Sequence, residues 1–133
     1  MLSVTIQEAL QGDSESAGHV LYVIRDRRVI FYVGRSVDPL NRLEEHLGHT
    51  GRNMYQPDRI GQLILKNHPA SLIWTIDLYT LEERHSKEIG LAESELIHSL
   101  DPCLNFIGNK NRTPLPLRYI KESAIANEGV ILE

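Results

Sequence analysis

The stretch VLYVIRDRRVIFYVGRSVDPLNRLEEHLG, residues 20–48, decides the fold of this chain. Its two apolar runs, VLYVI and VIFYVG, are rich in β-branched and aromatic side chains, which favour strands, and the charged gap between them is short enough for a hairpin turn. A helix is expected directly afterwards, because Asp38 is a good N-cap, Pro39 suits the first helical position and Gly48 suits the C-terminal end.

This hairpin and helix carry the polar side chains of most interest. Each predicted strand contains one tyrosine, Tyr22 in the first and Tyr32 in the second. Arg42 and His46 are four residues apart, so they share one face of the helix, beside its leucine stripe. The leucines are expected to anchor the helix in the core while Arg42 and His46 face a cleft. Taken one by one, the same residues also fit sheet packing and a solvated helix face.

The rest of the sequence predicts a small α/β (α+β) domain with a three-stranded, mostly antiparallel sheet flanked by helices. The further expected elements are a short helix capped by Thr5 with Glu8, a helix from the cap Asp58 to before Pro69, a strand over residues 72–79, and a helix from a Thr80 and Glu83 capping box to Leu100 with a break near Gly90.

Length and composition fit one globular domain. The chain has 133 residues, 41% of them hydrophobic and 24% charged, which is enough for one modest core. Its single cysteine, Cys103, excludes an internal disulfide and a cysteine-based zinc site, and fits a reducing cytosol. No apolar run approaches the ~20 residues of a membrane span, and no signal peptide opens the chain. We therefore expect a cytoplasmic protein with no membrane partner.

The net charge of −4 argues mildly against a nucleic-acid partner, since phosphate contacts need cations. The charge is unevenly distributed, however. Residues 19–66 hold eight Lys or Arg against five Asp or Glu, and the remainder holds six against thirteen. Any phosphate binding is therefore expected near the hairpin and first helix, and to be sensitive to salt. The alternative is an unevenly charged surface with no partner.

Glu93 is an acidic residue in an otherwise apolar helix stripe. It lies four residues after Ile89 and four before Ile97, so the three side chains share one face. Burying a carboxylate is costly unless it is paired, protonated or bound to a metal. Without further observations, a salt bridge or a place at the edge of the stripe is the favoured explanation of Glu93.

The hairpin resembles the paired motifs of the GIY-YIG nuclease family. Residues 20–22 (VLY) keep only the tyrosine of the first motif, whereas residues 32–34 (YVG) are a close match to the second. In that family a basic residue often follows the second motif, as Arg35 does here. A phosphate-binding arginine stands ten residues beyond the second tyrosine, where this chain has Arg42.

A second part of the resemblance lies in the late helix. The family has a metal-binding glutamate at the start of a pattern that here begins at Glu93 and continues through Leu100 and Pro102 to Asn105. The resemblance implies that Asn105 is a second polar residue of the active site. It covers a nuclease domain over residues 18–107, and residues 1–17 and 108–133 are expected to be N-terminal and C-terminal extensions.

The resemblance implies a metal-dependent endonuclease that hydrolyses DNA phosphodiester bonds, one strand per active site. Glu93 would hold Mg²⁺ or Mn²⁺, and Arg42, with Arg35, would bind the phosphate backbone. The two tyrosines would jointly assist the attack of water, with His46 sharing the proton. The implied catalytic residues are Tyr22, Tyr32, Arg42, His46, Glu93 and Asn105, which are expected to converge on one pocket.

A non-catalytic module that binds nucleic acid or protein on the same scaffold is the alternative. The acidic net charge favours it, as does the lack of room for a separate recognition domain. Relatives in the family usually draw specificity from a second domain or a partner, so a protein partner or a homodimer is expected here. DNA binding that persists in EDTA without cleavage would support this alternative.

Overall fold

The structure is a computed structural model that describes residues 2–12, 20–51, 54–81, 86–105, 114–116 and 118–119. It has the α/β (α+β) architecture expected from the sequence. In chain order the elements are β1 (Leu2–Thr5), α1 (Ile6–Gln11), β2 (Val20–Arg25), β3 (Ile30–Ser36), α2 (Pro39–His46), α3 (Arg59–Lys66), the 3-10 helix η2 (Ala70–Ile73), β4 (Thr75–Thr80) and α4 (Ser86–Leu100).

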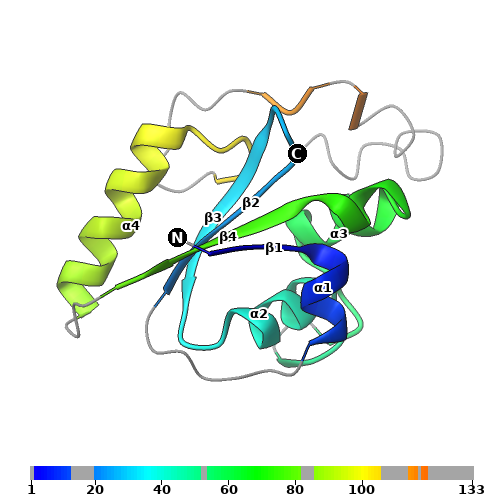
Figure 1. The fold of residues 1–133 in the computed structure, drawn as a ribbon, viewed down its shortest axis with the longest axis horizontal. Helices are drawn as coiled ribbons and strands as arrows, with labels where there is room; N and C mark the ends of the chain where they lie inside the picture. The colour runs from blue at the N-terminus through cyan, green and yellow to red at the C-terminus, as the bar shows by residue number, and fades with distance from the viewer. Residues whose placement is uncertain are drawn as a thin grey trace.

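Four strands of the described residues form one antiparallel sheet in the order β1-β4-β2-β3 (Figure 1). The predicted number of three is wrong, because β1 pairs with β4 from Leu2 opposite Leu78 to Thr5 opposite Thr75. A strand of four residues shows too little alternation to be identified from sequence. Residues 2–11 of the predicted N-terminal extension thus add a strand and a helix to this unit, while both predicted domain boundaries fall outside the described residues.

Most helix starts agree with the sequence. Thr5 and Glu8 form the predicted capping box of α1. The carboxylates of Asp38 and Asp58 accept hydrogen bonds from the first turns of α2 and α3, as N-caps do. Gly48 follows α2 with φ of 81°, a conformation that glycine adopts without strain.

The later elements differ from expectation. β4 begins at Thr75 instead of residue 72, because residues 70–73 form η2, and Trp74 donates its backbone N–H to Ser71. Thr80 ends β4 and does not cap the last helix, while its predicted partner Glu83 lies outside the described residues. The predicted break near Gly90 is also wrong, since α4 continues through it.

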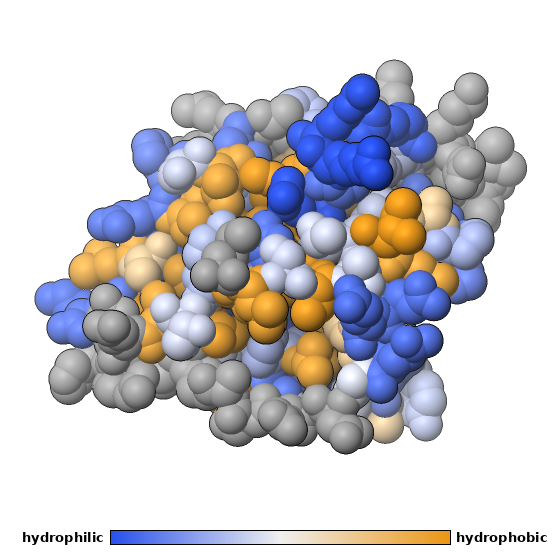
Figure 2. Space-filling view, in the orientation of Figure 1, coloured by the Kyte–Doolittle hydropathy of each residue, from blue (hydrophilic) through white to orange (hydrophobic). Residues whose placement is uncertain are grey.

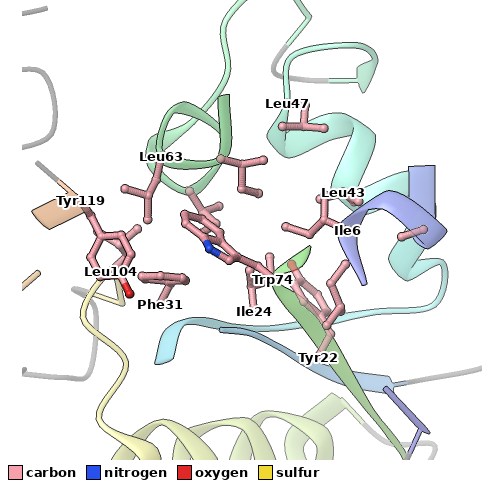
Figure 3. Packing of buried hydrophobic residues seen from close by; sticks show 14 of the residues in the cluster. Ile6, Tyr22, Ile24, Phe31, Leu43, Leu47, Leu63, Trp74, Leu104 and Tyr119 are labelled. Atoms are coloured by element: carbon pink, nitrogen blue, oxygen red, sulfur yellow. The ribbon is translucent and has the colours of Figure 1, made fainter. Parts of the chain in front are cut away.

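The sheet separates two layers of helices. Figure 1 shows α1, α2 and α3 on one side of the sheet and α4 on the other. The larger core lies on the first side, where Phe31, Trp74 and Leu63 pack between sheet and helices (Figure 3). On the second side, Ile97 of α4 packs on Val23 and Val33, and Figure 2 shows apolar residues gathered where α4 lies beside the sheet. None of the described helices is long and apolar enough to cross a membrane.

Candidate active site

Tyr22 of β2 lies over Gly34 of β3. The two residues are cross-strand partners, and a Cβ atom at position 34 would overlap the Tyr22 hydroxyl and ring. Only glycine leaves room for the buried ring there. Val20, two residues before Tyr22, lies in β2 opposite Ser36. Gly34 therefore has a packing role in this chain.

Tyr32 lies on the same face of the sheet as Tyr22, because it pairs with Ile24, which is two residues beyond Tyr22 in β2. The register of the hairpin shifts only beyond this pair, between Ile24 and Arg25, where β3 carries one extra residue. Both tyrosines pack against the larger core. The ring centroids of Tyr22 and Tyr32 are 6.1 Å apart. The two phenols therefore belong to one cluster.

α2 brings His46 against both tyrosine rings. The imidazole is fully buried, with its Nε2 atom 2.8 Å from the hydroxyl oxygen of Tyr22. Its ring centroid lies 6.0 Å from that of Tyr22 and 5.2 Å from that of Tyr32. The buried Leu43, one turn earlier, holds this face of α2 on the core. His46 and the two tyrosines are thus in direct contact.

Arg42 connects the tyrosine cluster to the surface. Burial raises the pKa of both Tyr22 and Tyr32, and the Arg42 guanidinium opposes that rise at each phenol through its charge and a side-chain hydrogen bond. The same guanidinium forms an ion pair with Glu45 of α2. The Arg42 side chain remains 31% exposed, so a ligand in solvent can reach it.

Asp58 completes the cluster, and the sequence predicted it only as a helix cap. Its Oδ2 atom lies 2.5 Å from Nδ1 of His46, and its Oδ1 accepts the N–H of Gly61 as the N-cap of α3. An N-cap uses only one of the two carboxylate oxygens of Asp58. The sequence therefore indicated that the second oxygen could bind another group. Spacing alone did not identify its partner, because His46 lies in a different helix.

Glu93 and Arg35 lie apart from this cluster. α4 packs on the opposite face of the sheet, and its Glu93 forms an ion pair with Arg35 of β3, with Oε1 and Nε 3.7 Å apart. Partial burial raises the pKa of Glu93, and Arg35 opposes the rise. The charge of Glu93 also raises the pKa of Tyr32, so it acts on the cluster from beside β3.

Asn105 contacts the backbone of β3 and is itself buried. Its Oδ1 atom accepts the N–H of Val33 and its Nδ2 atom donates to the Val33 carbonyl, each at 2.8 Å. These bonds hold the strand between Tyr32 and Gly34. Asn105 therefore positions β3 through its backbone, and both polar atoms of its side chain bond to Val33.

A pocket of about 380 Å³ opens beside Tyr32. Asp58, Arg59 and Gln62 of the α3 N-terminal region supply its polar lining. It lies against the tyrosine cluster, so a ligand in it would meet the side chain of Tyr32.

The acidic residues offer limited metal ligands. In the described part of the chain, no group of three or more His, Cys, Asp or Glu side chains is arranged to hold a metal ion. Glu93 supplies a single carboxylate, and Mg²⁺ is commonly held by one or two carboxylates with water and substrate phosphate. A cation would also stabilise the partly buried carboxylate, whose charged form burial disfavours. Glu93 therefore fits a weak site of the Mg²⁺ type.

Comparison with models of protein families, with curated proteins and with solved structures found no match.

Proposed function

We propose that this protein is a metal-dependent endonuclease of the GIY-YIG type that hydrolyses DNA phosphodiester bonds. One observation carries the proposal: the hydroxyl of Tyr22 lies 2.8 Å from Nε2 of His46, with Tyr32 and Arg42 acting on the same cluster. Such a group contains a proton acceptor and a cation, which a phosphodiester hydrolase needs to activate water and to stabilise phosphate charge.

In the proposed reaction, water attacks the phosphorus, the bond from phosphorus to the 3′ oxygen breaks, and that oxygen takes a proton from solvent, leaving 5′-phosphate and 3′-hydroxyl ends. The tyrosine pair Tyr22 and Tyr32 accepts the proton of the water after one phenol has lost its own proton, and His46 takes up that phenol proton through its bond to Tyr22. Arg42 binds the phosphate and favours phenolate formation, since its charge opposes the raised pKa of both tyrosines. The pocket beside Tyr32 gives the substrate access to that phenol.

Glu93 is the proposed ligand of Mg²⁺ or Mn²⁺. When bound, the ion would polarise the phosphate and supply cationic charge at the leaving oxygen. Arg35, which pairs with Glu93 in the free protein, binds the DNA backbone in this proposal. Asn105 supports the site by holding Val33. The cytoplasmic location and a specificity-giving protein partner or homodimer are parts of the same proposal.

A specific observation favours the non-catalytic alternative. Both proposed phosphate-binding arginines are paired with carboxylates, Arg42 with Glu45 and Arg35 with Glu93. Substrate phosphate must therefore compete with a neighbouring acid for each guanidinium. On this alternative the scaffold binds nucleic acid or protein, and the buried Tyr22 and His46 only stabilise the core.

Two assays on the wild-type protein separate the candidates. Supercoiled plasmid is incubated with the protein in Mg²⁺, in Mn²⁺ and in EDTA, and conversion to open circles is followed on gels. The nuclease produces open circles with either metal and none in EDTA. Fluorescence anisotropy of a labelled duplex in EDTA, over a range of salt, measures binding alone. Salt-sensitive binding with no nicking in either metal would reject the nuclease in favour of the binding module.

A further inference from the structure

His46 is held on two sides by a loop-to-helix junction. The backbone N–H of Asp58 donates to the His46 carbonyl at 3.1 Å, while the Asp58 carboxylate lies 2.5 Å from Nδ1 of the same residue. Gly61 packs on that carbonyl so closely that a Cβ atom would overlap its oxygen. The start of α3 therefore contacts both the backbone and the side chain of His46.

We infer that Asp58 is a positioning residue that fixes His46 as the tautomer with its proton on Nδ1, so that Nε2 is an acceptor aimed at the Tyr22 hydroxyl. An ionised carboxylate can only accept hydrogen bonds, so the proton between the two residues belongs to Nδ1. In a neutral imidazole the other nitrogen then carries the lone pair. The hydroxyl of Tyr22 donates to it.

The arrangement resembles the acid, base and hydroxyl order of hydrolase triads, with a phenol in the place of the serine hydroxyl. Within the proposed function, the phenol proton of Tyr22 moves to Nε2 and the imidazolium that forms stays beside the Asp58 carboxylate. The phenolate then takes a proton from the attacking water. The transfer of the Tyr22 proton during catalysis rests on the proposed nuclease activity. The assignment of the Nδ1–H tautomer to His46 does not depend on that activity.

The variant Asp58→Asn tests the inference with little change in shape. Asparagine keeps an oxygen that caps α3 at Gly61. Its amide now donates to Nδ1, so His46 is expected to carry its proton on Nε2 instead. Asp38→Asn is the matched control, because Asp38 caps α2 in the same way and its side chain accepts from Asn41. The control should leave the His46 tautomer unchanged.

The measurement is two-dimensional NMR of ¹⁵N-histidine-labelled full chain without DNA or metal. His46 is assigned by the signal that is lost in His46→Asn. We expect the Nδ1–H form in the wild type and in Asp38→Asn, and the Nε2–H form in Asp58→Asn. A wild-type His46 protonated on Nε2 or on both nitrogens would overturn the inference, and this result needs no folded variant. An Nδ1–H form that persists in folded Asp58→Asn would overturn it as well.

Plasmid nicking then separates this inference from the proposed function. If the protein is a nuclease, Asp58→Asn should nick on the order of 100-fold more slowly at saturating DNA, with KM little changed. Nicking by folded Asp58→Asn at the wild-type rate would overturn the positioning role. If the wild type does not nick DNA but has the Nδ1–H tautomer, the nuclease fails and the assignment of Asp58 stands.

Discussion

Asn105 holds both backbone polar groups of Val33, accepting its N–H and donating to its carbonyl at 2.8 Å each. The backbone N–H groups of residues 103 and 104 also donate to carbonyls of β3. The segment after α4 thus completes hydrogen bonds along the strand that carries Tyr32. The position of this tyrosine depends on a segment more than 70 residues later in the chain.

Asn105→Ala should destabilise the protein by about 1–3 kcal/mol, because the buried N–H and carbonyl of Val33 lose their partners. Urea unfolding followed by circular dichroism measures the free energy of unfolding. Asn41→Ala, at an exposed position of α2, is the control and should change it by less than about 0.5 kcal/mol. Equal stability of Asn105→Ala and wild type would contradict the backbone role.

Gly34→Ala should displace Tyr22 from His46, since the added methyl group would overlap the phenol. We expect a loss of about 1–3 kcal/mol in the free energy of unfolding and a change in the His46 ring signals. Gly90→Ala is the matched control. Its Cβ would lie 3.5 Å from Nη1 of Arg35, an ordinary contact, and alanine favours the helix. A Gly34→Ala protein with unchanged stability and His46 signals would argue against the packing described.

Stability should fall steeply in alkali. Burial raises the pKa of Tyr22 and Tyr32 in the folded protein, so above pH 10 these phenols ionise in the unfolded chain first. The stability that the two neutral phenols contribute is therefore complete below pH 10. It is lost as the pH rises toward the pKa values of these phenols in the folded protein. Each should add a slope of about 1.4 kcal/mol per pH unit to the loss.

Tyr22→Phe should lose the contribution of one phenol to the fall of the free energy of unfolding between pH 10 and 11. Urea unfolding at each pH measures this free energy. Tyr55→Phe, at a residue that is 89% exposed, should keep the wild-type slope. Parallel curves for wild type and Tyr22→Phe would show that the phenol of Tyr22 is not buried as described.

Glu45→Gln should strengthen DNA binding several-fold at low salt, because it releases Arg42 from its carboxylate partner. Fluorescence anisotropy with a labelled duplex in EDTA measures the Kd. Glu44→Gln removes the same charge from α2 but from a side chain paired with His49, so it controls for net charge. If both variants gain equally, Arg42 has no special part in phosphate binding.

Local sequence signals predicted much of the fold. Helix starts at Asp38 and Asp58 were predictable because an N-cap bonds to its own helix, and the hairpin because its two strands are adjacent in sequence. The strand β1 was not predictable, since Leu2–Thr5 becomes a strand only by pairing with β4, which is distant in the sequence. The contact of Asp58 with His46 likewise depends on how α3 docks on α2. Sequence spacing does not specify such docking.

Metal-dependent nicking by Glu93→Gln and Glu95→Gln tests the proposed nuclease most directly. Both changes remove one carboxylate from α4, but Glu93 faces Arg35 and influences Tyr32, whereas Glu95 is exposed. With supercoiled plasmid and Mg²⁺, wild type and Glu95→Gln should nick alike, and folded Glu93→Gln should nick on the order of 100-fold more slowly. Equal nicking by Glu93→Gln and wild type, or no nicking by the wild type in either Mg²⁺ or Mn²⁺, would contradict the proposed function.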